Sequence, residues 1–551
     1  MSSAPRLSYS SGASTVPLLG ETIGANLERT VALFGGREAL VSCHQNLRFT
    51  YTEFNDAVDV LARGLMAKGL APGDRLGLWS PNYAEWAMVQ FATAKIGVIL
   101  VNVNPAYRTH ELAYALNHSG CRMLIAAPNF KTSDYVAMVD SIRDELTVLE
   151  ETIFLFSNEW GELLARAAEV APSALAACSA TLQFDDPINI QYTSGTTGFP
   201  KGATLTHHNI LNNGYFVARG CEYTEHDRVC IPVPLYHCFG MVMGNLGATS
   251  HGACMVYPEA AFDPTATLRA LTNEKCTSLF GVPTMFIAQL GHADFASTDF
   301  SSLRTGLMAG SPCPVEVMKQ VTSTMHMPEV GIAYGMTETS PVSTQTATSD
   351  SLERRTGTVG TVHPHVEIKV VDPDTGAIVP RGTTGEFCTR GYSVMLGYWN
   401  EPEKTAEAID QSGWMHTGDL ATMDDEGFVN IVGRIKDMII RGGENVYPRE
   451  IEEFLYAHPD IVDVQVIGVP DEKYGEEIMA WVTLRDGATP VTAEDLRAYC
   501  TGKIAHYKIP RYVKVAEAFP MTVTGKVRKI DMRATSIADL GLESAASVLN
   551  A

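Results

Sequence analysis

The sequence predicts an α/β protein with a large N-terminal domain of layered α/β subdomains and a β-rich subdomain, followed by a smaller α+β C-terminal domain. Three observations lead to this class. The chain of 551 residues is longer than one hydrophobic core normally supports, so at least two domains are expected. Helical patterns alternate with short β-branched runs between Glu21 and Ala261, and strand-like runs with many turns follow after Thr356.

The N-terminal elements can be placed from their patterns. The most apolar stretch, residues 87–103, is interrupted by Gln90, Lys95 and Asn102. It is therefore expected to be a buried helix that leads into a strand, and no membrane-spanning segment is expected. The elements expected here are helices at residues 52–68 and 85–95 and strands at residues 75–79 and 97–103.

A loop rich in Gly and Thr occupies residues 193–198. Residues 188–192 before it are strand-like, and residues 206–218 after it have a helical pattern. The loop is therefore expected to bridge a strand and a helix.

The second half of the chain changes in texture. Between residues 356 and 432, turn sequences at 372–376 and 424–427 separate short strand-like pieces, and a β subdomain is expected. Farther on, Thr492 and Asp495 have the spacing of a helix capping box. We place the domain boundary just after Arg434, between a domain of residues 1–435 and one of residues 436–551. The elements expected in the second domain are helices at 449–457 and from 492, and strands at 462–467 and 478–484.

Composition argues against several classes of partner and compartment. The formal net charge of −22 disfavours nucleic acid or an acidic membrane as the main partner. The 11 cysteines include no C-x-x-C pair, so neither a zinc knuckle nor a disulfide framework is indicated. Residues 1–15 lack the apolar region of a secretory signal. A soluble, cytoplasmic protein with no integral membrane segment is expected.

The string Tyr192-Thr-Ser-Gly-Thr-Thr-Gly-Phe-Pro-Lys-Gly202 offers a surface suited to polyphosphate. It does not follow the Walker A pattern, in which Lys comes directly after Gly, because Pro200 precedes Lys201. If only a shorter part of this string were present, an ordinary surface turn rich in Gly, Ser and Thr would be the alternative interpretation. The residues that offer hydroxyls, flexible backbone N–H groups or a cation are Thr193, Ser194, Gly195, Thr196, Thr197, Gly198 and Lys201.

This string closely resembles the phosphate-loop signature of the adenylate-forming superfamily, which comprises acyl-CoA synthetases, luciferases and peptide-synthetase adenylation domains. The resemblance covers nearly the whole chain and is strongest to medium- and longer-chain fatty acyl-CoA synthetases. Six further motifs follow in the family's order: Pro234-Leu-Tyr-His-Cys-Phe-Gly240, Tyr334-Gly-Met-Thr-Glu338, Gly413-Trp-Met-His-Thr-Gly-Asp419, Gly433-Arg-Ile-Lys-Asp437, Gly442-Gly-Glu-Asn445 and Thr524-Gly-Lys526.

The resemblance implies a site for ATP and Mg²⁺. Glu338 is similar to the family's Mg²⁺ ligand, Thr337 to a phosphate contact and Tyr334 to the ring that stacks on adenine. A carboxylate so placed can hold Mg²⁺ against the phosphates. The residues implied on the two sides of adenine are Tyr334 and Gly335 on one side and Gly310, Ser311 and Pro312 on the other.

Two charged residues complete the implied adenylation site. Asp419 resembles the ribose ligand, because a carboxylate in a turn can accept both ribose hydroxyls, and Arg434 resembles a residue that assists it. Lys526 resembles the adenylation lysine. Attack of a carboxylate on the α-phosphate brings two anions together, so a cation at the developing charge lowers the barrier. Lys526 is expected to act as an electrostatic clamp and not as a general base.

The second half-reaction needs another geometry, because a pantetheine thiol must reach the acyl carbonyl after pyrophosphate has left. In the family, the small domain rotates about a hinge that matches residues 433–437, and this exchanges the Lys526 loop for the loop at 442–445. The resemblance therefore implies a mobile C-terminal domain, with Lys436 at the pivot and Gly442 and Gly443 along the pantetheine channel.

The acyl substrate is constrained by the residues around the aromatic motif. No acidic residue occurs between Asp227 and Glu259, so a buried substrate ammonium would lack a countercharge and amino acids are disfavoured. Residues 237–243 offer apolar, adaptable side chains for an acyl tail, with ordinary core packing as the alternative. By resemblance, His237 lines the acyl site near the carboxylate; a metal role for it is disfavoured because no companion ligands lie at metal spacing.

The sequence therefore predicts an ATP-dependent carboxylic acid–CoA ligase for medium- to long-chain fatty acids that uses ATP, Mg²⁺ and coenzyme A. It would form an acyl-adenylate and pyrophosphate, and then acyl-CoA and AMP. A ligase for an aryl or specialised natural-product acid, transferring to CoA or a carrier protein, is the alternative, and a homodimer stays open. A phosphotransferase would release ADP, and a nucleotide sensor would lack Lys526 or Glu338, both of which are present.

Overall fold

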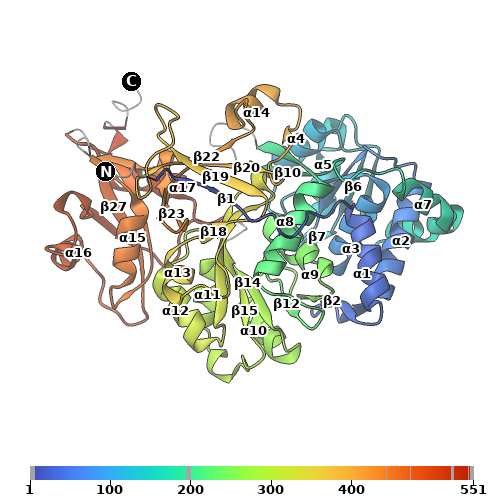
Figure 1. Ribbon diagram of the computed structural model, residues 1–551, viewed down its shortest axis with the longest axis horizontal. Helices are drawn as coiled ribbons and strands as arrows, with labels where there is room; N and C mark the ends of the chain where they lie inside the picture. Colours follow the sequence, from blue (N-terminus) through green and yellow to red (C-terminus); the bar gives the residue numbers. More distant parts are fainter. Residues whose placement is uncertain are drawn as a thin grey trace.

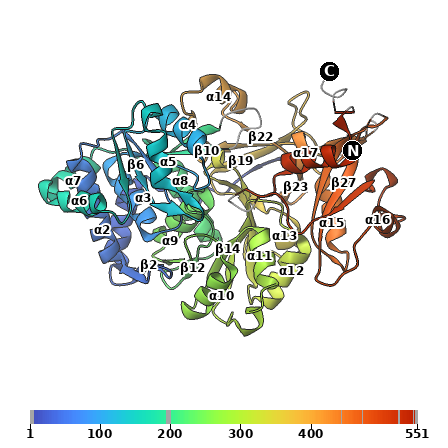
Figure 2. The same ribbon diagram turned by 180° about the vertical axis from the view of Figure 1, so that it is seen from behind.

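The computed structural model describes residues 6–193, 200–441, 444–471, 473–522, 526–543 and 545–546. Helices and sheets alternate through the first half, and the last part of the chain forms a separate unit at one end of the molecule (Figure 1). This arrangement confirms the predicted α/β class. The same grouping is seen from behind in Figure 2.

A seven-stranded sheet forms the first layer. Its central strands are parallel from β10 to β9, whereas β11 and β21 join one edge antiparallel. The predicted strand at residues 75–79 is confirmed as β4, with the same bounds. In sheet order the strands are β21 (Gly397–Tyr398), β11 (Lys201–Thr206), β10 (Pro187–Thr193), β5 (Ile99–Asn102), β4 (Arg75–Trp79), β6 (Met123–Ala126) and β9 (Glu151–Phe154).

A nine-stranded sheet forms the second layer, and it is parallel from β16 to β2 with antiparallel strands at both edges. Parallel strands with helices on their faces are buried on both sides, which accounts for their apolar sequences. In sheet order the strands are β18 (Thr361–Val362), β17 (Val342–Gln345), β16 (Glu329–Gly335), β15 (Thr305–Ala309), β14 (Ser278–Gly281), β12 (Arg228–Cys230), β13 (Cys254–Tyr257), β2 (Glu38–Ser42) and β3 (Leu47–Thr50).

Helices are present at the three places predicted in this half, as α2, α3 and α8. Helix α2 begins with a capping box between Thr50 and Glu53, and α3 ends at Gly97, whose φ of 68° suits a residue without a Cβ. Every residue of α3 except Glu85 is buried, so the prediction of a buried helix leading into a strand is confirmed. The main helices of this half are α1 (Ile23–Phe34), α2 (Tyr51–Ala67), α3 (Ala84–Ile96), α4 (Thr109–Ser119), α5 (Tyr135–Ser141), α6 (Asn158–Ala165), α7 (Pro172–Ser179), α8 (His207–Gly220), α9 (Gly247–Ser250), α10 (Pro264–Asn273), α11 (Pro283–Leu290) and α12 (Val315–Thr324).

The expected bridge from strand to helix around residues 193–198 is wrong. After these residues the chain enters β11, which pairs antiparallel with β10, and only then begins α8. The short run Lys-Gly-Ala-Thr-Leu-Thr has little periodicity of its own, and its pairing with β10 and β21 decides its conformation. Thr193 and Lys201 are consequently cross-strand partners.

The predicted β subdomain is a five-stranded antiparallel sheet that also recruits the N-terminal strand β1. Asp372 and Asp424 each accept backbone N–H bonds in the turns predicted at these positions. In sheet order the strands are β1 (Tyr9–Ser11), β19 (Val366–Val371), β20 (Gly385–Gly391), β22 (Met415–Met423) and β23 (Val429–Arg434); helices α13 (Leu352–Gly357) and α14 (Pro402–Ala408) lie between strands in the chain.

The C-terminal unit has its own sheet and cores. Two of its hydrophobic clusters contain only residues from Ile439 onward, and this supports the boundary that we propose at residues 435 and 436. The capping box of Thr492 with Asp495 is present at the start of α16. The elements are β24 (Ile439–Arg441), β25 (Glu444–Val446), α15 (Pro448–Tyr456), β26 (Ile461–Asp471), β27 (Gly475–Leu484), α16 (Ala493–Cys500), β28 (Tyr512–Val515) and α17 (Lys529–Leu540).

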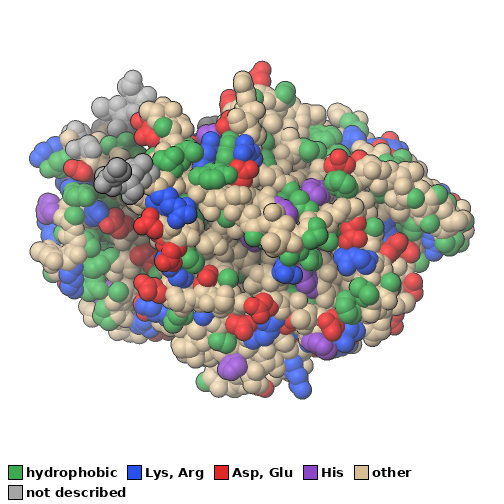
Figure 3. Space-filling view, viewed as in Figure 1, with side chains coloured by type: hydrophobic (Ala, Val, Ile, Leu, Met, Phe, Trp, Pro, Cys, Tyr) green, Lys and Arg blue, Asp and Glu red, His purple; other side chains and the backbone are tan. Residues whose placement is uncertain are grey.

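Surface and cysteine chemistry complete the description. Acidic and basic side chains are interspersed over the face shown in Figure 3. All 11 cysteines are free thiols. Within the described residues, every helix is too short or too polar to cross a lipid bilayer.

Candidate active site

The predicted site residues gather where strands of the larger unit end. Tyr334 and Gly335 close β16, and the one-turn helix η5 (Thr337–Thr339) follows directly. Thr193 is the last residue of β10, and Gly310 comes just after β15. Ligand sites of α/β sheets form at the carboxyl ends of strands because loops there converge from neighbouring strands.

Glu338 lies at the centre of one group. Its side chain is only 5% exposed, and its Oε1 atom accepts hydrogen bonds from Tyr398 Oη at 2.9 Å and Thr193 Oγ1 at 3.3 Å. The ammonium group of Lys201 lies over the face of the Tyr398 ring, with Nζ 4.2 Å from the ring centre. Tyr398 therefore contacts both Lys201, at the start of β11, and Glu338, the predicted metal ligand. Glu338 in turn contacts Thr193, at the end of β10.

Tyr398 was missed by the sequence reasoning. It lies 60 positions from Glu338 in the chain, and no spacing connects the two residues. Pairing of β21 with β11 places Tyr398 opposite Ala203, next to the phosphate loop. The aromatic residue after Gly397 gives a local strand signal at most, so only the sheet reveals the contact.

Glu338 has the chemistry of a Mg²⁺ ligand. Both of its hydrogen bonds go to Oε1, and within the described residues no hydrogen bond reaches Oε2. A buried carboxylate with one free oxygen offers the hard donor that Mg²⁺ prefers. Thr337 is buried beside it, at the start of η5.

Tyr334, Asp419 and Arg434 form a second group. Tyr334 Oη donates a hydrogen bond to Asp419 Oδ2 at 2.7 Å, and Arg434 Nε lies 3.2 Å from Asp419 Oδ1. Burial raises the pKa of Asp419, whereas the charge of Arg434 and the Tyr334 hydroxyl oppose that rise. The ring of Tyr334 meets Phe387 edge-on at 5.2 Å between ring centres, which fixes its orientation.

An irregularity in β22 presents Asp419. Cys388 pairs with His416 and Glu386 pairs with Leu420, so β22 advances by four residues over the length in which β20 advances by two. The extra residues bulge out of the sheet at Gly418, whose φ is 71°. This bulge directs the Asp419 carboxylate toward Tyr334.

Lys526 lies between these two groups although it belongs to the C-terminal unit. A Cβ atom at Gly310 would be 3.8 Å from Lys526 Cε, so the lysine stem passes close to that glycine. Desolvation lowers the pKa of Lys526, and the nearby charge of Arg434 lowers it further, while Glu338 and Asp419 oppose this. The described structure thus brings the predicted lysine to the predicted metal and ribose ligands.

Steric constraints explain why glycine occupies positions 310 and 335 of the site. Gly310 has a φ of 90°, a region that residues with a side chain rarely occupy. A Cβ at Gly335 would fall 1.7 Å from the carbonyl oxygen of Pro341, so no side chain fits there. Ser311 and Pro312 continue from Gly310 along the surface, where Ser311 O lies 3.5 Å from Cys313 Sγ.

His237 and the predicted acyl segment lead into the core. Burial lowers the pKa of His237 to about 3, and the charge of Lys526 adds to the effect, so the imidazole is neutral at physiological pH. Its Nδ1 accepts the Phe239 backbone N–H at 3.3 Å, which leaves the proton on Nε2. Residues 239–246 form a buried π-helix, η3 (Phe239–Leu246), so the apolar side chains predicted for the acyl tail belong to the hydrophobic core.

A buried polar layer under this π-helix was also missed. Gln191 accepts a hydrogen bond from Cys238 Sγ at 3.1 Å and contacts Met241 Sδ at 3.1 Å. Asn102 donates to the Tyr236 carbonyl at 2.8 Å. The only sequence signal was the presence of the amide side chains of Asn102 and Gln191 in two apolar strands, because buried amides need hydrogen-bond partners. This layer fixes the backbone around His237.

The remaining predicted residues belong to the hinge, the phosphate loop and the loop at 442–445. Lys436 lies in the one-turn helix η6 (Ile435–Asp437), directly after Arg434. Outside the described residues lie Ser194, Gly195, Thr196, Thr197, Gly198, Gly442 and Gly443.

Comparison with known proteins agrees with this geometry. Residues 27–399 match the model of the AMP-binding enzyme family, and residues 450–526 match the AMP-binding enzyme C-terminal domain. The acyl-CoA synthetase candidate YngI of Bacillus subtilis (strain 168) is 48% identical over 96% of this chain and 99% of its own length. The mitochondrial medium-chain acyl-CoA ligase ACSF2 of Danio rerio is 46% identical over 97% of this chain and 91% of its own. The crystal structure of the anthranilate CoA ligase AuaEII with anthranoyl-AMP has a TM-score of 0.85 at 26% identity, and the match covers 95% of this chain and 98% of that one.

Proposed function

The chain belongs to the AMP-binding enzyme family and is an AMP-forming acyl-CoA ligase, and we propose that it activates medium-chain fatty acids through the residues described above. The position of Lys526 carries the proposal. Its cation lies among the predicted metal ligand, the predicted ribose ligand and Gly310. A lysine there has the location that α-phosphate attack requires.

ATP binding divides between the two groups of side chains. Asp419 accepts the ribose hydroxyls, and Tyr334 covers one face of adenine while Gly310 approaches the other. Thr193 and Lys201 would contact the phosphates, and Glu338 would hold Mg²⁺, with Thr337 beside it. Bound Mg²⁺ would neutralise phosphate charge. The contacts of Tyr398 with Glu338 and Lys201 support this division, because they fix the metal ligand and the phosphate lysine relative to each other.

The adenylation step then follows from electrostatics. A carboxylate oxygen of the acid attacks the α-phosphorus, the bond from that phosphorus to the bridging oxygen breaks, and pyrophosphate leaves. Lys526 stabilises the negative charge that grows on the α-phosphoryl oxygens. No proton has to move, which agrees with an electrostatic role for the lysine.

For thioester formation we propose that the C-terminal domain rotates near Lys436 and withdraws Lys526. Coenzyme A would approach along Gly442 and Gly443, its thiol would release its proton to solvent, and the sulfur would attack the acyl carbonyl and displace AMP. His237 stays at the acyl side as a neutral imidazole, because its burial disfavours the charged form. Separate cores in the two units support rotation as rigid bodies.

The acid and the compartment belong to the same proposal. ACSF2 is named as a medium-chain ligase, and the absence of acidic residues between Asp227 and Glu259 excludes a countercharge for an amino acid from this stretch. The π-helix η3 would border the acyl tail, since apolar side chains follow directly after His237. Eleven free thiols support a reducing compartment such as the cytoplasm.

An acid panel tests the proposal directly. Straight-chain acids of increasing length, benzoate and anthranilate are each supplied with ATP, Mg²⁺ and coenzyme A, and pyrophosphate, AMP and thioester are measured. We expect AMP and acyl-CoA in equal amounts with the highest kcat/KM on medium-chain acids. Activity confined to the aryl acids would overturn the assigned acid class, and release of ADP would overturn the reaction.

A further inference from the structure

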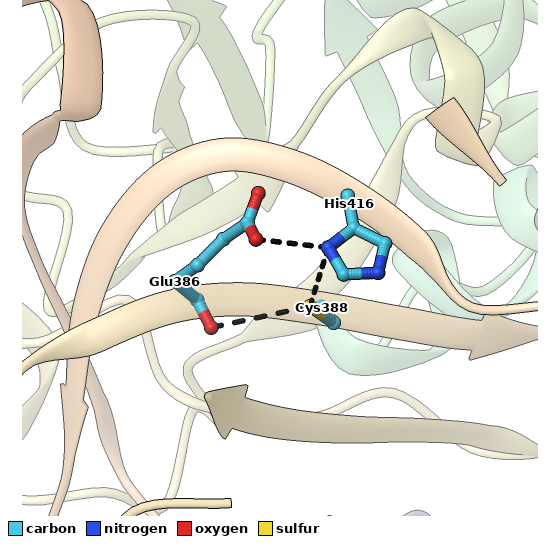
Figure 4. Close-up of side chains that lie close together, drawn as sticks. All are labelled: Glu386, Cys388 and His416. Atoms are coloured by element: carbon cyan, nitrogen blue, oxygen red, sulfur yellow. Dashed lines mark hydrogen bonds and ion pairs between the residues drawn. The ribbon is translucent and has the colours of Figure 1, made fainter. Parts of the chain in front are cut away.

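A second group of chemically reactive side chains lies on the β-rich sheet, outside the residues assigned to ATP. Cys388 on β20 and His416 on β22 are direct cross-strand partners, and Glu386 lies two residues before Cys388. Residues two apart on a strand share a face. Figure 4 shows the three side chains pointing toward one another, and their ligand atoms all lie within 4.8 Å.

The distances in this cluster fit a small tetrahedral ion. His416 Nδ1 lies 3.5 Å from Cys388 Sγ and 2.8 Å from Glu386 Oε2. Tetrahedral Zn²⁺ bonds place sulfur and nitrogen ligands about 3.5 Å apart and nitrogen and oxygen ligands about 3.4 Å apart. The Cys–His pair is already at that separation, and Glu386 Oε2 needs to retreat by about half an ångström. Its other oxygen, Oε1, accepts the Gly418 N–H at 3.1 Å and can keep that bond.

Asp410 supplies the outer contact that metal-bound histidines commonly have. Its Oδ2 lies 3.8 Å from His416 Nε2, on the opposite side of the ring from Glu386 and Cys388. The backbone N–H groups of Ser412 and Trp414 hold the Asp410 carboxylate through Oδ1. Without a metal, Nδ1 donates its proton to Glu386 Oε2; when a metal takes Nδ1, the Asp410 carboxylate stabilises the proton on Nε2.

Charge and access are consistent with a bound cation. Burial raises the pKa of Cys388 to about 12, so the thiol has to lose its proton when a metal binds. Lys369, the cross-strand partner of Cys388 on β19, opposes a cation, but two carboxylates and one thiolate outweigh its single charge. His416 and Asp410 are 33% and 35% exposed, so the ion can enter from solvent.

We propose that Cys388, His416 and Glu386 bind one transition-metal ion of the Zn²⁺ class, with Asp410 orienting the histidine and water completing the coordination. On binding, the Cys388 proton goes to solvent, and His416 exchanges the proton on Nδ1 for one on Nε2. The thiolate and imidazole select a softer ion than Mg²⁺, which prefers oxygen ligands such as Glu338. Because Glu386 also holds Gly418, the ion would brace the bulge that presents Asp419.

Cobalt binding tests this site in the full-length, tag-free protein after metal has been stripped with a chelator. Co²⁺ is titrated in the absence of ATP and Mg²⁺. We expect one equivalent to bind with a thiolate-to-cobalt charge-transfer band, Zn²⁺ to abolish that band, and Zn²⁺ to raise the unfolding temperature. Absence of the band at one equivalent would overturn the proposal.

Variants separate this site from other cysteines. Cys388→Ser should lose the charge-transfer band, and His416→Gln should weaken Co²⁺ binding at least tenfold. Cys313→Ser, a change at another buried thiol, should keep the band. A band that persists in Cys388→Ser contradicts the site. Near-UV circular dichroism checks that each variant folds. If Cys388→Ser does not fold, unchanged Co²⁺ affinity in both His416→Gln and Glu386→Gln would contradict the proposed site.

Discussion

Lys526 shows at the residue scale how surroundings assign a role to a side chain. It comes from a turn-rich segment near the C-terminus, where most lysines are solvated. Here its stem passes Gly310, and the charges that act on it are those of Arg434, Glu338 and Asp419. In the proposed mechanism, a cation in this position stabilises charge on the α-phosphate without giving up a proton.

Replacing this lysine should separate the two half-reactions. Lys526→Ala is expected to slow pyrophosphate release by about 10²- to 10³-fold, as loss of a preorganised charge-stabilising group does. Thioester formation from supplied acyl-adenylate and coenzyme A should remain within about threefold of the wild-type rate, because the lysine is withdrawn in that step. Equal loss in both assays would refute this division of labour.

The lowered pKa of Lys526 predicts the alkaline limb of adenylation. The charged ammonium is present below the pKa of Lys526 and is lost as the pH rises through that pKa. The adenylation rate should therefore begin to decline at a pH below the ordinary lysine pKa of about 10.4. Lys526→Arg, measured for residual activity, should move the limb upward because a guanidinium stays charged. A profile that declines at the same pH in both proteins would exclude Lys526 as its source.

Tyr398 offers a matched test of the metal ligand. Tyr398→Phe keeps the ring under Lys201 and removes the hydroxyl that donates to Glu338. A hydrogen bond to a charged group contributes about 1.5–3 kcal/mol, so the Mg²⁺ concentration for half-maximal pyrophosphate release should rise about tenfold or more. The KM for coenzyme A should stay unchanged, and a Mg²⁺ requirement equal to wild type would refute the positioning role.

At the scale of elements, interruptions of regular structure shape the site. The chain inserts β11 between the phosphate loop and α8, which makes Thr193 and Lys201 cross-strand neighbours. The irregularity in β22 lies at Gly418, next to Asp419, which keeps its pairing with Arg434 of β23, and Glu386 accepts the Gly418 N–H. Both features depend on pairing with strands that are distant in the sequence.

A contact between helices α12 and α15 holds the two units in the observed orientation. Glu453 Oε2 accepts the Val315 N–H at 3.3 Å, at the first turn of α12. Burial raises the pKa of Glu453, so a fall in pH protonates it sooner than an exposed glutamate and weakens this cap.

Removing this cap should favour the rotated state. A helix cap contributes about 1 kcal/mol, so Glu453→Ala should shift the orientation equilibrium about fivefold. We expect pyrophosphate release to slow by up to that factor while thioester formation from supplied acyl-adenylate is preserved. Glu316→Ala, at an exposed acid on the same turn of α12, serves as the control. Similar slowing in both variants would show a general charge effect and contradict the cap.

At the scale of the whole molecule, function depends on two units with separate cores. The cores of the C-terminal unit contain only residues from Ile439 onward, whereas Lys526 in that unit completes a site built by the other. The larger unit thus contains the residues proposed to bind the nucleotide, and the smaller one contains the lysine proposed to assist adenylation.

A cut at the proposed boundary tests this organisation. A fragment of residues 1–435 should fold and bind ATP, since Tyr334, Asp419 and Glu338 all lie within it. It should release no pyrophosphate with an acid, because it lacks Lys526. Calorimetry of ATP binding and the pyrophosphate assay measure the two outcomes, and an unfolded fragment or an active one would contradict the boundary or the role of the lysine.

Local sequence determined much of this protein. Hydrophobic periodicity placed α2, α3 and β4 within a residue or two, because residues on one helix or strand face share the same burial. The capping box at Thr492 is local as well. The seven ordered motifs determined the family and the reaction class, since each carries its chemistry in a few consecutive residues.

Tertiary structure alone decided which distant residues meet. Tyr398 reaches Glu338, and His416 reaches Cys388, through strand pairings that link segments far apart in the chain. Cys388 and His416 lie 28 positions apart, so no local spacing of ligands indicates this group, whereas the sheet register joins them. Strand β11 between the phosphate loop and α8 was missed for the same reason. Register depends on the summed packing of whole sheets, and no local pattern of side chains encodes it.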